Sequence, residues 1–297
     1  MTSGPRVLEL FCGIGGCAAA VDGRARVVAA VDVNPNALAA YARNFPHPVS
    51  ARSLESLPAA AFRAWDADLW WLSPPCQPFT ERGRRRDADD PRARPFLTVI
   101  ARIAEVRPRY VALENVPGFA GSQVHARLLR TLERAGYGSV RERLLCPSEL
   151  GVPNRRQRYY LVASRDALRP LPPPPSPPPR PLETYLDAEE PPGLRVAPEL
   201  LERYAGALHV VDAGDPRTVT ACFTSAYGRS FVRSGSYLRV DGHVRRFSPS
   251  EVLRLLGFPA AYGLPPELPP RKAWALAGNS LSLAPLRATL AAIPELA

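Results

Sequence analysis

Short apolar runs alternate with helical segments through the first half of this chain, and this alternation restricts the fold more than any other feature. Four runs carry few polar residues; they span residues 7–11, 27–31, 68–72 and 110–113. Helical patterns follow them at residues 17–21, 34–44, 96–106 and 122–135. Because the runs lack the polar alternation of a half-exposed strand, they predict strands covered on both faces. Strands separated by helices indicate an α/β fold with a doubly wound, mostly parallel sheet.

A proline tract divides the rest of the chain. Proline dominates residues 169–181, which favours an extended, semi-rigid linker over a ligand for a partner protein. Beyond it we expect a helix that begins near Ser248, which has capping-box spacing to Glu251, and a terminal helix from Asn279 onward. The large domain is predicted to span residues 1–168, with later strands at 140–145 and 159–163. The linker (169–181) and a small irregular region (182–246) follow it. C-terminal helices (247–297) are expected to return to the large domain.

The charge balance points to a polyanionic partner. The chain has 38 basic and 28 acidic residues, a net charge of +10, which favours nucleic acid. Lys272 is the only lysine. Since a GC-rich genome also produces such an arginine bias, charge alone does not establish the partner.

Other features exclude several classes of protein. No apolar run approaches the roughly 20 residues that span a bilayer, and the N-terminus lacks the pattern of a signal peptide, so we expect a cytoplasmic protein without a membrane partner. The five cysteines are an odd number, which favours reduced thiols over a disulfide framework. Cys12 and Cys17 have no second Cys or His pair nearby, so no metal site is expected. We expect a monomer.

A glycine-rich turn follows the first predicted strand. Gly13, Gly15 and Gly16 lie between that strand and a helix, where glycine lets the backbone approach a ligand. Asp32 ends the next strand, where a carboxylate can accept hydrogen bonds from ribose hydroxyls. The pattern fits dinucleotide, nucleotide and methyl-donor binding alike. It equally fits turn glycines beside a helix-capping aspartate.

Two further turns follow the next two predicted strands. Cys76 lies in the turn Pro74-Pro75-Cys76-Gln77, and ligand chemistry in parallel sheets occurs at the carboxyl ends of strands. This thiol is either an inert small residue or a nucleophile that needs thiolate stabilisation. Glu114 ends the following strand, and a carboxylate beside a thiol opposes thiolate formation. Glu114 is therefore expected to hold, or give a proton to, a ring nitrogen of the substrate.

The segment Asn154-Arg155-Arg156-Gln157-Arg158 precedes a predicted strand. Arginines two residues apart there can contact a phosphate or a base carbonyl together. The same segment also fits a solvated run of charge.

Taken in order, these motifs resemble those of the cytosine-5 methyltransferases. The matching segments are Phe11-Cys12-Gly13-Ile14-Gly15-Gly16, Pro74-Pro75-Cys76-Gln77, Glu114-Asn115-Val116, Asn154 to Arg158, and Gly278-Asn279-Ser280. The resemblance covers the chain from Val7 to about Leu290. It implies a Rossmann-like, class I fold that uses S-adenosylmethionine, with a small target-recognition domain.

The resemblance also implies roles for individual residues. Cys76 would attack C6 of cytosine and Glu114 would contact the ring nitrogen N3, while Arg156 and Arg158 would hold the base carbonyl and a nearby phosphate. Further substrate contacts are expected at Gln77, Asn115, Arg82, Arg84, Cys222, Phe223 and Thr224. The methyl-donor pocket would be lined by Phe11, Gly13, Ile14, Gly15, Gly16, Asp32, Val33, Ser53, Leu54, Pro75, Asn279 and Ser280.

One tripeptide favours RNA over DNA. Cys222-Phe223-Thr224 is similar to the signature of the family branch that modifies cytosine 38 in the tRNA anticodon loop. Asn154 stands where most DNA-directed members carry Gln, and the short region 182–246 leaves little room for a DNA-reading module. The resemblance therefore implies a tRNA substrate, with tRNA-Asp or tRNA-Glu as the first candidates.

Several departures and alternatives stay open. Cys12 stands where Ser is commoner, and Ser53 or Leu54 replaces a carboxylate that often contacts the donor. Cys222 fits either a second thiol near the catalytic centre or a small packed residue. The rival functions are a DNA cytosine-5 methyltransferase and a catalytically silent nucleic-acid-binding protein. A nucleotide-dependent oxidoreductase would explain only the glycine turn.

Overall fold

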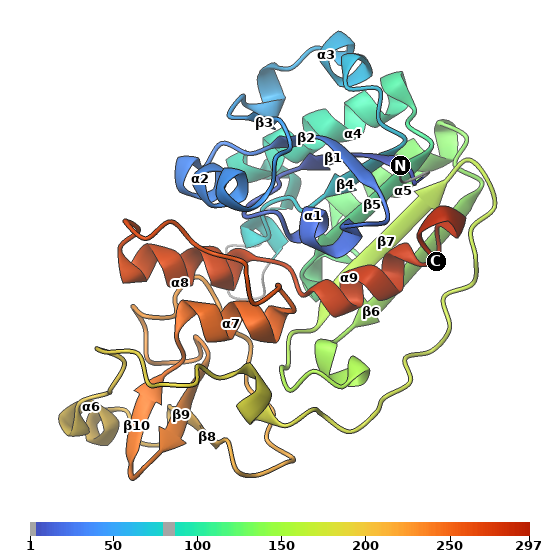
Figure 1. Cartoon of the computed structure of the whole chain (residues 1–297). Coiled ribbons are helices and arrows are strands. Elements are labelled where there is room, and N and C mark those ends of the chain that lie inside the picture. Colours follow the sequence, from blue (N-terminus) through green and yellow to red (C-terminus); the bar gives the residue numbers. More distant parts are fainter. Residues whose placement is uncertain (1–3, 80–86) are drawn as a thin grey trace. The chain divides into compact units, whose positions relative to one another are not determined.

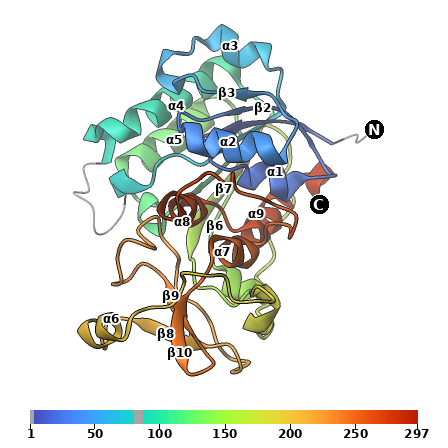
Figure 2. The same ribbon diagram turned by 60° about the vertical axis from the view of Figure 1, so that its left-hand side comes forward.

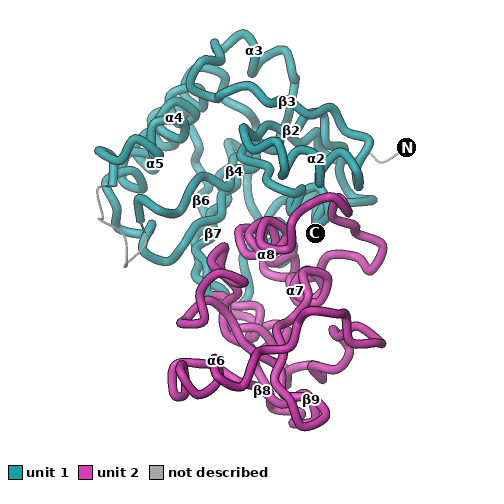
Figure 3. Tube along the Cα trace, turned by 90° about the vertical axis from the view of Figure 1, so that its left-hand side faces the viewer, with its two compact units in different colours: residues 1–145, 157–172, 286–297 teal, residues 146–156, 173–285 magenta. Residues whose placement is uncertain are grey.

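The computed structural model describes residues 4–79 and 87–297, and these fold into two compact units. Unit 1 comprises residues 1–145, 157–172 and 286–297, and unit 2 comprises residues 146–156 and 173–285 (Figure 3). The chain therefore crosses between the units several times. The sequence predicted contiguous domains instead, and it assigned all of 247–297 to the first. The contacts that define these units join residues far apart in the chain, so composition along the chain does not reveal them.

Unit 1 is built on a seven-stranded sheet with the strand order β3-β2-β1-β4-β5-β7-β6 (Figure 1). The strands are β1 (Arg6–Leu10), β2 (Arg26–Val31), β3 (Val49–Ser50), β4 (Leu69–Leu72), β5 (Tyr110–Asn115), β6 (Ser139–Leu145) and β7 (Arg158–Ser164). Strands β1 to β5 pair in parallel, while β7 lies antiparallel to both β5 and β6. The predicted α/β fold with a mostly parallel sheet is confirmed.

Alternate residues of each strand face two different helical layers. The helices of unit 1 are α1 (Gly16–Val21), α2 (Pro35–Asn44), α3 (Ala59–Ala64), α4 (Arg94–Val106), α5 (Gln123–Arg134) and α9 (Leu283–Leu290, which begins in unit 2). Leu8, Val111 and Leu161 share a buried cluster with apolar residues of α4 and α5. Figure 2 shows α1 and α2 on the opposite face of the sheet. Both faces are covered, which explains why the strands read as continuous apolar runs.

The chain order places two motifs at the centre of the sheet. From β1 the chain moves outward through β2 to β3, then returns to β4 on the other side of β1 and continues to β5. The carboxyl ends of β1 and β4 therefore flank the point where the winding reverses, which is the usual ligand site of an open α/β sheet. The glycine-rich turn follows β1, and the Cys76 turn follows β4.

Unit 2 is more regular than the sequence predicted. Its sheet has three strands in the order β10-β9-β8: β8 (His209–Asp212), β9 (Ser236–Val240) and β10 (His243–Arg246). Its helices are α6 (Pro198–Arg203), α7 (Pro249–Leu256) and α8 (Pro270–Asn279). The structure ends α8 at Asn279, where the sequence predicted that a terminal helix would begin; that helix, α9, starts at Leu283.

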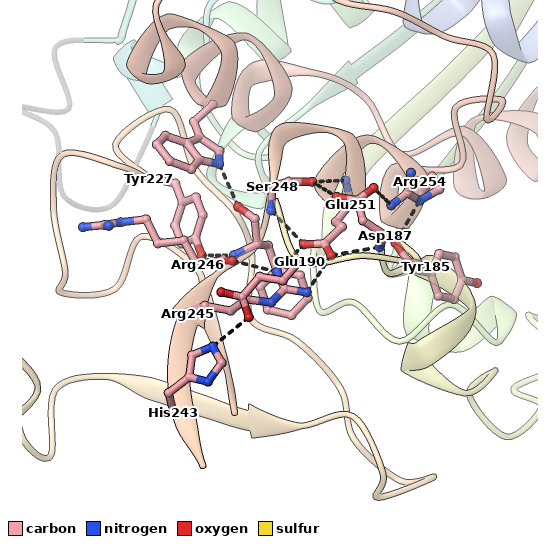
Figure 4. Close-up of polar contacts among 12 residues, drawn as sticks. Tyr185, Asp187, Glu190, Tyr227, His243, Arg245, Arg246, Ser248, Glu251 and Arg254 are labelled. Atoms are coloured by element: carbon pink, nitrogen blue, oxygen red, sulfur yellow. Dashed lines mark hydrogen bonds and ion pairs between the residues drawn. The ribbon is translucent and has the colours of Figure 1, made fainter. Parts of the chain in front are cut away.

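A buried ion pair joins the small sheet to α7. Arg245 donates two hydrogen bonds of 2.8 Å to the carboxylate of Glu251, and both side chains are almost fully buried. Ser248 caps α7 and forms the predicted capping box with Glu251. Asp187 accepts a hydrogen bond from the Ser248 hydroxyl and pairs with Arg254 (Figure 4). The pairing matters for stability because each buried charge is satisfied by its partner.

The proline tract is partly anchored in unit 2. The boundary between the units falls after Pro172. Beyond it, the backbone N–H of Ser176 donates to Glu149 and that of Arg180 to Gly151. Most of the tract is exposed, but its second part belongs to unit 2 and does not lie between the units in the chain.

Among the described residues, no helix is both long enough and apolar enough to cross a membrane.

Candidate active site

The turn after β1 leaves open space at one glycine. Gly13 has a positive φ of +53°, and a Cβ added there would meet nothing within 4 Å. Its backbone N–H donates to Asp32 Oδ2 at 2.9 Å, and the other carboxylate oxygen accepts from Asn34 N at 2.8 Å. Each carboxylate oxygen can accept a second hydrogen bond. Asp32 thus fixes the turn and retains acceptor capacity beside open space, as a ribose site requires.

Gly15 has a different role from Gly13. Its φ is +86°, and a Cβ there would lie 2.5 Å from the Phe45 ring and 3.0 Å from Tyr41. Glycine at this position therefore lets the start of α1 pack against the end of α2. Gly16 is buried as the first residue of α1, and Ile14 is also buried. Of the predicted donor-binding residues in this turn, Gly13 is the one that faces open space.

A fully buried carboxylate lies beneath the same turn. Glu9 on β1 accepts hydrogen bonds from Cys17 N (2.9 Å) and Ala18 N (3.2 Å) in the first turn of α1, and from the Tyr41 hydroxyl (3.2 Å). Burial raises the pKa of Glu9 to about 8, although these donors oppose the shift. Glu9 ties the sheet to the helix that carries the glycine turn, a role that the sequence did not reveal.

The other predicted donor-pocket residues of unit 1 differ in how much of each side chain is exposed to solvent. Val33 follows β2 with 65% of its surface exposed, so an apolar side chain faces solvent beside Asp32. Ser53 is exposed, and Pro75 is half-buried. Phe11 has a positive φ of +57° and packs edge-on against Phe96. Leu54 is only 4% exposed and packs in the core; its contact with the donor stays a prediction.

Several interactions fix the Cys76 turn to the end of the sheet. The N–H of Ser73 donates to Leu10 O, and the N–H of Phe79 to Cys76 O. The Asn115 side-chain amide donates to Pro74 O at 3.2 Å. A Cβ on Gly118 would lie 2.4 Å from Phe79 O, so glycine there lets the turn after β5 approach the turn after β4. Gln77 begins the 3₁₀ helix Gln77–Phe79 directly after Cys76.

Asn115, whose contact with substrate stays a prediction, holds the end of the sheet and the Cys76 turn together. Its side chain is 1% exposed, with the amide bonded to Pro74 and Oδ1 accepting from Val116 N at 2.8 Å. Asn115 therefore positions the Cys76 turn against the end of β5.

Glu114 and Arg158 form an ion pair at the same edge of the sheet. Arg158 Nε lies 3.1 Å from Glu114 Oε1, and both side chains are largely buried. The register explains the contact: Glu114 lies opposite Tyr160, so Arg158, two residues earlier on β7, is its diagonal neighbour on the same face. The guanidinium offsets the negative charge of Glu114, which lessens the opposition that this carboxylate offers to a nearby thiolate.

A second arginine near Cys76 was missed in the sequence. Arg92 donates to both oxygens of Asp90, at 2.9 and 2.6 Å. Hydrogen bonding to Asp90 raises the pKa of Arg92, and Cys76 adds a smaller electrostatic contribution. Asp90 offsets the positive charge of Arg92, so the pair resembles Glu114 and Arg158 in carrying no net charge. The only signal in the sequence was Asp-Pro-Arg within a run of alternating charges.

Arg156 belongs to unit 2, whereas Arg158 belongs to unit 1. Arg156 is 4% exposed, and its guanidinium donates to three carbonyl oxygens, those of Phe223 (2.9 Å), Gly278 (3.1 Å) and Ser280 (2.5 Å). It thus connects three distant segments of unit 2. These partners give Arg156 a structural role, while its contacts with a base and a phosphate stay a prediction.

The segments that Arg156 joins include two of the predicted motifs. Cys222 Sγ lies 3.4 Å from Arg156 Nη1, and a Cβ on Gly278 would lie 2.3 Å from the Thr224 carbonyl. Phe223 is 2% exposed and packs edge-on against Phe247; its contact with substrate stays a prediction. Asn279 is exposed and Ser280 is buried.

Two further predictions concern the loop after Cys76 and the absence of a metal site. Arg82 and Arg84 lie outside the described residues. Asp87, which follows them in the chain, accepts hydrogen bonds from Gln123 N and Val124 N at the start of α5. Within residues 4–79 and 87–297, no group of three or more His, Cys, Asp or Glu side chains could hold a metal ion.

Comparison with known proteins decides the family. A family model described as C-5 cytosine-specific DNA methylase matches residues 5–193. The chain belongs to this family. A Spodoptera frugiperda protein named tRNA (cytosine(38)-C(5))-methyltransferase is 31% identical, over 94% of this chain and 96% of that protein. A Dictyostelium discoideum protein named DNA (cytosine-5)-methyltransferase is 28% identical, over 94% and 91%.

A solved structure extends the comparison to the fold. The crystal structure of a Spodoptera frugiperda DNMT2 mutant matches with a TM-score of 0.84 and 29% identity, covering 98% of this chain and 99% of that one. Membership of the cytosine-5 methylase family makes the protein a methyltransferase. It also explains why the Cys76 and Glu114 turns end neighbouring strands of the sheet.

Proposed function

We propose that the protein methylates C5 of cytosine 38 in the anticodon loop of a tRNA, with tRNA-Asp and tRNA-Glu as the first substrates to test. The observation that carries the chemistry is the ion pair between Glu114 and Arg158. Glu114 lies on β5, the neighbour of the strand β4 that leads into Cys76, and Arg158 lies on β7. The choice of tRNA is supported by Cys222-Phe223-Thr224 and by the activity for which the Spodoptera relative is named.

Cys76 supplies the nucleophile. Cytosine C5 reacts poorly with electrophiles while the ring is intact. Addition of the Cys76 thiolate to C6 forms an S–C6 bond and moves the C5–C6 electron pair into an enamine, whose C5 is nucleophilic. Once C5 has accepted the methyl group that bound S-adenosylmethionine would supply, leaving S-adenosylhomocysteine, loss of the C5 proton and breakage of the S–C6 bond restore the aromatic ring and return the thiolate. The anticodon loop is single-stranded, so the base can leave its stack at low cost.

Glu114 and Arg158 stabilise the charge that develops on the ring. In this proposal Glu114 contacts N3 and the exocyclic amine of the base, where attack at C6 increases electron density. Arg158 holds the carboxylate in place through the 3.1 Å contact and offers its other N–H groups to the base carbonyl. Because the two side chains are largely buried, their electrostatic effect on the ring is stronger than it would be in water.

The turn after β1 fits S-adenosylmethionine. Gly13 leaves open space, Asp32 retains acceptor capacity for ribose hydroxyls, and exposed Val33 offers an apolar surface for the adenine. When bound, S-adenosylmethionine supplies the methyl group. The residues of this chain bind the donor and keep it next to the Cys76 turn, since β1 and β4 are neighbours.

A methylation assay tests the proposal. The purified protein is incubated with labelled S-adenosylmethionine and a tRNA-Asp or tRNA-Glu transcript, and bisulfite sequencing locates the modified base. We expect label at cytosine 38, none in a transcript with uracil at that position, and none with Cys76→Ala, which should still bind S-adenosylhomocysteine. Incorporation into genomic DNA but not into tRNA would establish the DNA methyltransferase instead.

A further inference from the structure

A ladder of three aromatic rings runs from the interior of unit 2 to its surface. Tyr237 on β9 is fully buried. The ring of Phe231 stacks on it with centroids 5.7 Å apart and planes within 11° of parallel. The ring of Tyr204, just after α6, stacks in turn on Phe231 at 5.1 Å and 12°. Phe231 and Tyr204 are only half-buried, so the ladder reaches solvent at Tyr204.

Arginines accompany this ladder. The guanidinium of Arg246 lies 4.9 Å from the centre of the Phe231 ring, and that of Arg203 lies 5.6 Å from the centre of the Tyr204 ring. Figure 4 shows Arg246 extending away from the Arg245–Glu251 pair, as expected for neighbouring residues of a strand. Arg246 is therefore separate from the buried ion pair that holds unit 2 together.

Exposed arginines flank Phe231 and Tyr237 along the chain. The segment 226–240 contains Arg229, Arg233 and Arg239 and no acidic residue, and all three arginines are exposed. Among the described residues, neither these three nor Arg203 and Arg246 form an ion pair. Tyr237 and Arg239 lie on the same face of the small sheet. The strand register places one acidic residue on that face, Asp212, which lies opposite Arg239. The area thus combines aromatic rings with positive charge that no carboxylate of the described chain neutralises by direct contact.

We propose that this ladder and its arginines form a binding surface for unpaired nucleotides of the RNA substrate. A base would stack on the half-buried ring of Tyr204 at the end of the ladder, and the exposed arginines would contact the flanking phosphates. Exposed aromatic rings and arginines are the two elements by which proteins bind single-stranded nucleic acid. The inference deepens the proposed function because it rests on RNA being the substrate, and it concerns residues other than the catalytic ones.

Direct binding measurements test this surface independently of catalysis. The probe is a fluorescein-labelled oligouridine of about 12 nucleotides, within the length that such surfaces cover, and fluorescence anisotropy of the full chain gives Kd. Tyr204→Ala should weaken binding about 5- to 100-fold because it removes one base–aromatic stack. Tyr204→Phe keeps the ring and should bind within about twofold of the unchanged protein.

A second variant guards against misfolding of the first. Arg233→Ala combined with Arg239→Ala removes two exposed charges without touching the ladder. It should lower the slope of log K against log salt by about 0.7 for each phosphate that an arginine no longer neutralises. Arg134→Ala, an exposed arginine at the end of α5 in unit 1, is the matched control and should leave Kd unchanged. Unchanged binding in both the Tyr204→Ala and the double-arginine variants would overturn the proposal.

Turnover measurements separate this proposal from the proposed function. With the tRNA transcript, Tyr204→Ala should raise KM for tRNA while leaving kcat and KM for the methyl donor unchanged. If the protein methylates tRNA and Tyr204→Ala has normal KM and normal oligouridine binding, the surface proposal fails and the function stands. If no tRNA is methylated but oligouridine binding still depends on Tyr204, the function fails and the surface stands.

Discussion

Glu114 and Arg158 meet as diagonal neighbours on antiparallel strands, with 3.1 Å between the carboxylate and Nε. A carboxylate next to a nucleophilic thiol would by itself oppose formation of the thiolate. With Arg158 in place the pair carries no net charge, and Glu114 can contact the base without that penalty. In the proposed mechanism the arginine thus has two effects, one on the substrate and one on the conditions under which Cys76 ionises.

Replacing Arg158 should therefore change both rate and pH dependence. We expect Arg158→Ala to lower kcat about 100- to 1,000-fold, the usual cost of removing one electrostatic stabiliser. The pH–rate profile should also shift upward, because the unneutralised Glu114 carboxylate opposes the thiolate. Arg158→Lys retains the charge and should recover part of the rate and most of the shift. A lower rate with an unchanged pH profile in Arg158→Ala would contradict the second effect.

Substitution by alanine should have different main effects at Gly13 and Gly15: weaker ligand binding at the first, and lower stability at the second. Gly13→Ala fits sterically, so it should cost only about 1–2 kcal/mol for the positive φ and mainly weaken the binding of S-adenosylhomocysteine. Gly15→Ala overlaps the Phe45 ring, so it should lower stability by a further 1–3 kcal/mol, roughly. Thermal unfolding and titration calorimetry measure the two effects. Equal destabilisation in both variants would show that Gly15 is not specialised for packing.

Arg156 and Arg155 offer a matched pair. Arg156→Ala leaves three buried carbonyl oxygens without their donor, so we expect unfolding free energy to fall by about 3 kcal/mol or more. The adjacent Arg155 is exposed, and Arg155→Ala should stay within about 0.5 kcal/mol of the unchanged protein. Chemical denaturation checks both. A stable but inactive Arg156→Ala protein would support the direct catalytic role predicted from the sequence.

The sequence predicted the sheet and the residues at strand ends because both depend on local patterns. Continuous apolar runs located β1, β2, β4 and β5, and the spacing of Ser248 and Glu251 located the capping box. What side chains do was harder to predict. Arg156 and Arg158 have equal chemistry and lie two residues apart, yet one satisfies buried carbonyls and the other pairs with Glu114. Their partners come from distant segments, which no local pattern contains.

The same limit applies to three predicted site residues that the structure buries. Leu54, Phe223 and Asn115 lie within or beside functional motifs, so the sequence assigned them to ligands. The structure buries all three, since a motif also needs residues that hold it in place. The units differ from the predicted domains for a related reason: α7 and α8 pack with segments of unit 2 that lie far from them in the chain.

Glu9 gives the last prediction, a dependence of stability on pH. Its pKa rises from 4.5 to about 8 on folding, so between these values the folded state binds a proton that the unfolded state does not. Stability is then fully present below pH 4.5 and falls as pH rises toward 8. Between pH 5 and 7.5 this lowers the free energy of unfolding by about 3 kcal/mol.

His47 acts in the opposite direction, because burial lowers its pKa from 6.5. The test therefore compares two variants of the protein over the same pH range. Glu9→Gln cannot titrate, and its unfolding free energy, measured by denaturation across this range, should fall less steeply with pH than that of the unchanged protein. Parallel curves for the two proteins would mean that Glu9 stays ionised in the folded state, held by Cys17, Ala18 and Tyr41.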